Sequence, residues 1–126
     1  MVPGDLRYTS DHEWIRVEGD EVVVGITDFA AHPLGDIVFV ELPAVGKALK
    51  AHATFGVVES VKAVSDLFAP IGGEVLAAND ALTANPELVN GDPYGEGWML
   101  RMRPADAGEI SALLDAAAYE QVVAEG

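Results

Sequence analysis

The feature that most restricts the fold is a series of short runs of β-branched and aromatic residues, each closed by Gly, Pro, Asn or Asp. Such runs between turn-forming residues are typical of β-strands. One run, at 35–42, is almost continuously apolar, which predicts a strand buried on both faces. We expect strands over 13–17, 21–26, 35–42, 46–49, 55–60, 65–69, 74–77 and 98–102, with Gly72-Gly73 as a turn.

Two segments between the strands favour other structure. Thr27 and Asp28 offer N-cap chemistry for a single helical turn that ends near Gly35. Residues 79–97 are rich in Pro, Gly, Asn and Asp, so we expect a long ordered loop there, with one helical turn near Pro86.

The composition changes after Pro104, where it favours two helices over 106–114 and 115–124 that pack on the β core. Asp106 and Asp115 are the expected N-caps of these helices. The expected fold class is therefore mostly β with short helices (α+β). We expect a single domain over 1–126, with its β core at about 8–103 and its C-terminal helices at about 106–124.

Composition excludes several functions. The chain has 126 residues, half of them apolar, and a formal net charge of −14. This charge repels nucleic acid and anionic membranes, and it favours either simple solubility or attraction to basic faces on partner proteins. With no cysteine, neither a disulfide nor a thiolate nucleophile can form. The N-terminus lacks the apolar core of a signal peptide and no apolar run reaches about 20 residues, so we expect a cytoplasmic protein.

Lys62 is the residue most suited to carry chemistry. The other lysines, Lys47 and Lys50, flank a polar turn, whereas Lys62 lies between two β-rich runs that are separated by very few residues. This placement predicts a hairpin tip. An amine at a tip can enter the active sites of several enzymes, which an amine on a sheet or helix face cannot do, and acylation there would remove its charge.

The sequence resembles the glycine cleavage system H protein family from about Tyr8 to about Val122. The resemblance is specific because many blocks match in register. These blocks are His12-Glu13-Trp14, Val24-Gly25-Ile26-Thr27-Asp28, the stretch from Leu34 to Pro43, Val58-Glu59-Ser60-Val61-Lys62-Ala63, Gly73-Glu74-Val75, the stretch from Asn85 to Asn90, the stretch from Asp92 to Trp98, and Leu113-Leu114.

This resemblance implies a barrel-sandwich hybrid fold, as in other lipoyl and biotinyl domains, and lipoic acid bound as an amide to Lys62. It also implies four partners: a pyridoxal-phosphate glycine decarboxylase (P protein), an aminomethyltransferase (T protein), dihydrolipoyl dehydrogenase (L protein) and a lipoate or octanoate ligase or transferase. The chain would carry the aminomethyl group and electrons between them, as a substrate of each enzyme and not as a catalyst.

The family pattern also suggests roles near the lysine. Glu13 and Asp66 match positions that line a cleft for the loaded arm, where a carboxylate would pair with a buried cation. A solvated strand acid at Glu13, and a ligase contact or turn cap at Asp66, are the alternatives. Glu59 resembles the family's ligase-recognition acid, or it is a surface charge that balances the lysine. A polar residue that faces the arm in the family corresponds to Pro33 here, and His32 beside it is the candidate to take its role.

Other functions fit the sequence less well. The three histidines and Glu13 match no metal or acid–base motif, so neither an enzyme nor a metal site is expected. A biotin carrier resembles this chain in fold, but its lysine lies between methionines, whereas Val61 and Ala63 flank the lysine here. A lipoyl or octanoyl relay donor to other complexes and a pure interaction module are the further alternatives. We expect a monomer, since a mobile carrier gains from small size.

Overall fold

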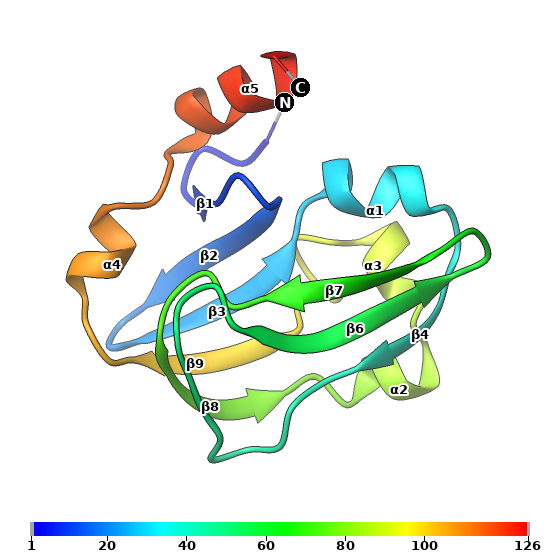
Figure 1. Ribbon diagram of the computed structural model, residues 1–126, viewed down its shortest axis with the longest axis horizontal. Coiled ribbons are helices and arrows are strands. Elements are labelled where there is room, and N and C mark those ends of the chain that lie inside the picture. The colour runs from blue at the N-terminus through cyan, green and yellow to red at the C-terminus, as the bar shows by residue number, and fades with distance from the viewer. Residues whose placement is uncertain (1, 126) are drawn as a thin grey trace.

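The computed structural model describes residues 2–125, which form two antiparallel sheets and several short helices (Figure 1). The larger sheet has six strands in the order β1-β2-β3-β9-β8-β5, and the smaller has three in the order β4-β6-β7. The strands are β1 (Arg7–Tyr8), β2 (Glu13–Glu18), β3 (Glu21–Ile26), β4 (Ile37–Glu41), β5 (Ala48–Leu49), β6 (Thr54–Ser60), β7 (Val64–Phe68), β8 (Gly73–Ala78) and β9 (Leu100–Pro104). The predicted class, mostly β with short helices, is therefore confirmed.

Strand β3 shows how the core is built. Val22 and Val24 pack into the main core with side chains from both sheets, whereas Val23 faces a second cluster around Tyr8, Trp14 and Tyr119. Because alternate residues of a strand point to opposite faces, this strand is buried on both sides. It therefore joins the two apolar clusters into one continuous interior.

The helices are short, and they differ in part from the sequence-based expectation. They are α1 (Asp28–Leu34), α2 (Ala81–Ala84), α3 (Leu88–Gly91), α4 (Gly108–Ser111) and α5 (Ala116–Glu125). Helix α1 runs for seven residues and not for one turn, and the segment 79–97 contains two short helices, one on each side of Pro86. In the described part of the chain, no helix is long and apolar enough to cross a membrane.

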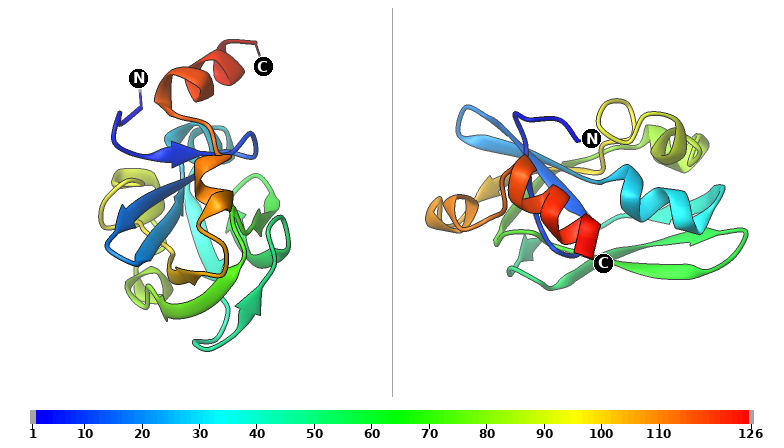
Figure 2. Two further views of the ribbon diagram at one scale, coloured as in Figure 1. Left: turned by 90° about the vertical axis from the view of Figure 1, so that its left-hand side faces the viewer. Right: turned by 90° about the horizontal axis from the view of Figure 1, so that it is seen from above.

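The C-terminal helices also depart from the expected lengths. Helix α4 is only four residues long, whereas α5 begins one residue after Asp115, as expected. The Asp115 carboxylate accepts a hydrogen bond from the Ala118 N–H at 2.8 Å, which confirms the predicted N-cap. Helix α5 lies at one end of the molecule, outside both sheets (Figure 2).

The prediction that the 35–42 run is buried on both faces is wrong. Val38 is 54% exposed and Phe39 is 48% exposed, so two adjacent apolar side chains of this run lie at the surface. The reason is topological, because β4 is an edge strand of a three-stranded sheet that covers the core with only one face. The apolar residues of β4 therefore lie on both its core-facing side and its exposed side.

Two glycines allow close contact between elements. A Cβ on Gly56 would lie 2.1 Å from the Glu41 carbonyl oxygen, far inside the normal contact distance. Gly73 belongs to strand β8 and not to a turn, and a Cβ there would lie 2.3 Å from the Arg103 carbonyl oxygen. The absence of a side chain at both positions therefore allows close approach of the neighbouring backbone.

Candidate functional site

Lys62 lies at the tip of the β6–β7 hairpin, which projects from the molecule at the right of Figure 1. The Ser60 N–H donates to the Ala63 carbonyl at 2.8 Å, and the N–H groups of Lys62 and Ala63 donate to the Ser60 hydroxyl oxygen at 3.2 Å and 3.0 Å. These bonds hold the backbone of the tip. The Lys62 side chain itself is exposed.

The loop between α1 and β4 supports the tip from one side. The Val61 N–H donates to the Asp36 carbonyl at 3.1 Å, and a Cβ on Gly35 would lie 3.5 Å from the Lys62 Cε. An open hollow of about 450 Å³ lies beside the lysine. It is lined by Lys62, Asp28, Ala31, His32, Gly35, Asp36 and Asn90.

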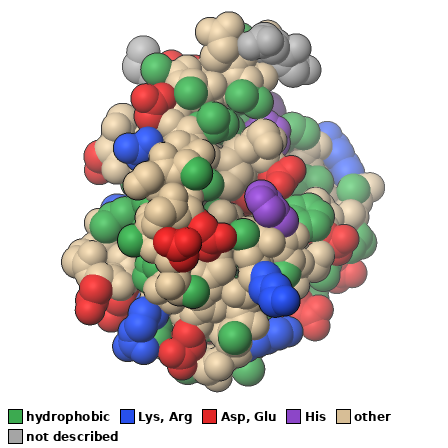
Figure 3. All heavy atoms as spheres, turned by 60° about the vertical axis from the view of Figure 1, so that its left-hand side comes forward, with side chains coloured by type: hydrophobic (Ala, Val, Ile, Leu, Met, Phe, Trp, Pro, Cys, Tyr) green, Lys and Arg blue, Asp and Glu red, His purple; other side chains and the backbone are tan. Residues whose placement is uncertain are grey.

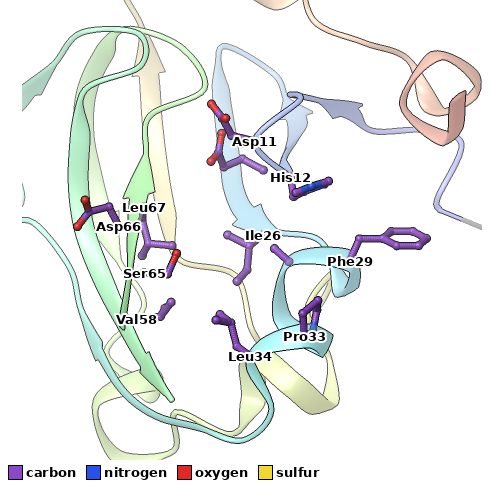
Figure 4. A pocket seen from close by; sticks show the side chains of 12 residues that line it. Asp11, His12, Ile26, Phe29, Pro33, Leu34, Val58, Ser65, Asp66 and Leu67 are labelled. Atoms are coloured by element: carbon purple, nitrogen blue, oxygen red, sulfur yellow. The ribbon is translucent and has the colours of Figure 1, made fainter. Parts of the chain in front are cut away.

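A separate cleft of about 300 Å³ lies between the turn before β2, helix α1 and the β6–β7 hairpin (Figure 4). Its lining residues are Asp11, His12, Glu13, Ile26, Phe29, Ala30, Pro33, Leu34, Val58, Ser65, Asp66 and Leu67. Helix α1 therefore separates two depressions. Pro33 lines the cleft, whereas His32 lines the hollow beside Lys62.

Glu13 is the buried acid of this cleft, with only 3% of its surface exposed. It accepts a hydrogen bond from the Thr9 hydroxyl at 2.7 Å. Burial disfavours the charged form and raises the pKa of Glu13 to about 7, against the opposing effect of the Thr9 hydrogen bond, and the negative charge of Asp11 adds to the rise. Glu13 can therefore gain or lose a proton near neutral pH.

Asp66 also lines the cleft, but its carboxylate points to the opposite side of β7 from Ser65 and Leu67 (Figure 4). This follows from the two-residue period of a strand, which turns Ser65 and Leu67 inward and Asp66 outward. The structure thus brings the backbone of Asp66 to the cleft wall while its charge faces the solvent.

Glu59 lies on β6, between Phe39 of β4 and Val64 of β7 in the register of the small sheet. It is partly exposed, and Val64 is 64% exposed. The face of the sheet next to Lys62 therefore presents an acid between two apolar side chains.

Two residues that shape the cleft were missed in the sequence. Thr9 bonds Glu13, and Tyr119 of α5 bonds His12, which lines the cleft. Thr9 lies four residues before Glu13, and its hydroxyl oxygen also accepts hydrogen bonds from the Asp11 and Glu13 N–H groups at 3.2 Å each, so a turn formed by a threonine hydroxyl is the signal that could have found it. Tyr119 is more than 100 residues from His12 along the chain, so no local pattern could connect the two.

The arrangement of charged side chains limits the chemistry that this site can support. Among the described residues, no group of three His, Asp or Glu side chains is arranged to hold a metal ion. On the face drawn in Figure 3, acidic and basic side chains are interspersed. The chemistry that the site can support is therefore acylation of an exposed amine, together with binding of a small cationic group beside Glu13.

Comparison with known proteins agrees with this geometry. The family model described as glycine cleavage H-protein matches residues 6–126. The chain is 61% identical over 121 residues to the glycine cleavage system H protein of Bacteroides thetaiotaomicron, covering 96% of each chain, and 64% identical over 118 residues to that of Magnetococcus marinus, covering 94% of this chain and 84% of the relative.

A solved structure extends the comparison to the fold. The crystal structure of a glycine cleavage system H protein from Mycobacterium marinum matches with a TM-score of 0.90 and 43% sequence identity, over 98% of this chain and 99% of that one. The two-sheet arrangement is thus the lipoyl-domain-like barrel-sandwich fold that the resemblance predicted. The chain belongs to the glycine cleavage H-protein family, the lipoyl carriers of the glycine cleavage system.

Proposed function

We propose that the Lys62 amine carries lipoic acid as an amide, and that the chain transfers aminomethyl groups and electrons in this form. The observation that carries the proposal is the exposure of Lys62 on a hydrogen-bonded hairpin tip. A modifying enzyme can reach such an amine without unfolding the chain. Because hydrogen bonds to Ser60 fix the backbone of the tip, every partner enzyme meets the amine in the same position.

The residues around Lys62 fit a lipoyl amide. No salt bridge within the described residues involves this amine, so acylation breaks no ion pair. Ser65, Asp66 and Leu67 follow Lys62 by three to five residues, so at about 3.3 Å per residue the cleft is roughly 10–17 Å from the tip. A lysine extended by an eight-carbon acyl chain has a comparable reach. The bound group would supply a reversible disulfide for the one-carbon unit and for electrons.

Glu13 is the residue we assign to hold a cationic amine in the cleft. A buried carboxylate that accepts a hydrogen bond from Thr9 but has no cation beside it is still unfavourable when ionised, and a cation that enters the cleft relieves this cost. Apolar side chains of Ile26, Leu34 and Leu67 line the same cleft and limit the access of water. For Asp66 we propose a contact to a partner enzyme, since its carboxylate points outward.

The partners that we propose are the pyridoxal-phosphate glycine decarboxylase, the aminomethyltransferase, dihydrolipoyl dehydrogenase and a lipoate or octanoate ligase or transferase. The net charge of −14 favours basic faces on these enzymes. Glu59, three residues before Lys62, is the acid we propose for recognition by the ligase or transferase. The chain would act as a cytoplasmic monomer and as a substrate in each step.

The test is the intact mass of the chain purified from its native cells. We expect an increase equal to the mass of one lipoic acid less one water, which peptide mapping places on Lys62. Lys62→Arg should remove the increase and all carrier activity while the melting temperature stays unchanged. Lys50→Arg, at another exposed lysine, is the matched control and should keep both. Glycine cleavage supported by Lys62→Arg would overturn the proposal.

A further inference from the structure

Tyr119 places a hydroxyl at the junction of two elements that form the cleft. The residue belongs to α5, is fully buried, and stacks on Tyr8 with ring centroids 4.7 Å apart. Its hydroxyl oxygen lies 2.6 Å from the His12 Nδ1 and 2.7 Å from the Thr27 hydroxyl oxygen. One side chain of the C-terminal helix thus bridges two segments that are far from it in sequence.

These two segments are opposite walls of the cleft. His12 directly precedes β2 and lines the cleft next to Glu13. Thr27 is the N-cap residue of α1, whose Ala30 and Leu34 line the other wall. The walls also meet where the Thr27 N–H donates to the His12 carbonyl at 2.9 Å. The Thr27 hydroxyl makes no capping bond within α1 and instead bonds to Tyr119.

The backbone at His12 explains why this bridge is needed. His12 has a φ of +69°, in the left-handed region that side chains other than glycine rarely adopt. Such a conformation persists only where surrounding contacts hold it. The hydrogen bond between the Tyr119 hydroxyl and the His12 ring is one such contact, and the two rings also pack in a T-shaped arrangement with centroids 5.7 Å apart.

We propose that Tyr119 is a positioning residue for the cleft: its hydroxyl fixes His12 against Thr27 and thereby sets the separation of the two walls beside Glu13. This inference rests on the proposed function in one respect, namely that a lipoyl arm occupies the cleft. The packing of the C-terminal helix would then control how well water is excluded from the cargo.

The first experiment uses the unmodified full chain, so it does not depend on the lipoyl assignment. Tyr119→Phe removes the hydroxyl and keeps the ring stack with Tyr8. Loss of one hydrogen bond should make amide hydrogen exchange at the Thr27 N–H roughly tenfold faster. Water that enters the cleft should also lower the pKa of Glu13, because it solvates the charged form. Carboxyl NMR measures this pKa. The ionisable groups around Glu13 are Asp11 and His12 on its own turn, Asp66 on β7 and Tyr119 itself.

Matched variants separate positioning from general stability. Tyr94→Phe removes another tyrosine hydroxyl that bonds α1, through Asp28 at 2.7 Å, and it should leave both readouts unchanged. Thr27→Val should reproduce the effect of Tyr119→Phe and Thr27→Ser should not, because serine keeps the hydroxyl. The double variant with Thr27→Val and Tyr119→Phe should be no worse than either single one, since both remove the same bridge.

A second experiment uses the lipoylated chain loaded with an aminomethyl group. One water converts the aminomethyl thioether into the thiol, formaldehyde and ammonium, and this loss should be roughly tenfold faster in Tyr119→Phe. Normal Thr27 exchange and Glu13 titration in Tyr119→Phe, with only a lower melting temperature, would overturn the inference. A wild-type chain that carries no lipoyl group would refute the proposed function but leave the first experiment valid.

Discussion

Replacing Glu13 with glutamine tests the electrostatics of the cleft directly. The pKa of Glu13 is about 7 in the folded chain and 4.5 ordinarily, which corresponds to about 3 kcal/mol at about 1.36 kcal/mol per pKa unit. Because this pKa is raised on folding, the folded chain holds more protons than the unfolded chain between pH 4.5 and 7. The stabilising contribution of the protonated group is thus complete below pH 4.5 and is lost as the pH rises through 7.

Glutamine cannot ionise, and its amide oxygen can still accept the hydrogen bond from Thr9. The Glu13→Gln chain should therefore gain stability over the wild type as the pH rises, by about 2.5 kcal/mol between pH 5 and pH 8. Urea denaturation of both chains across this range measures the difference, and the shared loss of stability from other groups cancels. Glu87→Gln, at an exposed glutamate, controls for the added amide. A pH-independent difference for Glu13→Gln would refute the reasoning.

Two further variants test the packing and the recognition face. Gly56→Ala should lower the unfolding free energy by about 1–3 kcal/mol, because its Cβ would lie 2.1 Å from the Glu41 carbonyl oxygen and overpack the sheet. Gly4→Ala is the control, since a Cβ there meets nothing within 4 Å. Thermal melting compares the two variants. Glu59→Gln should lower the rate of lipoylation roughly fivefold without a change in melting temperature, as expected for one lost charge contact of about 1 kcal/mol at a surface; an unchanged rate in an assay with purified ligase would contradict the role of Glu59.

Much of the fold follows from local patterns in the sequence. Strands β3 and β6 fall on their predicted runs almost to the residue, because β-branched residues between turn formers act locally. The same holds for the Asp115 cap, where a short side chain bonds a backbone N–H three residues away. The tip at Lys62 follows from two such runs, 55–60 and 65–69, that are separated by very few residues.

Features that depend on neighbouring elements could not be predicted. Phe39 is exposed because β4 is an edge strand with one covered face, which only the topology determines. His32 and Pro33 fall on opposite sides of α1, because successive residues of a helix point about 100° apart. The outward direction of Asp66 depends on the register of β7, which a one-residue shift would reverse. The bridge from Tyr119 to His12 is a tertiary contact that no periodicity indicates.

Glu13 shows a conflict between stability and function in this small fold. At neutral pH its burial destabilises the empty chain, and glutamine would relieve that cost. A cation beside the carboxylate favours the ionised form, so its binding at pH 7 should release about half a proton. The burial that lowers stability therefore makes the carboxylate prefer a cationic cargo over an uncharged arm. This preference is why we expect glutamate at this position in spite of its cost.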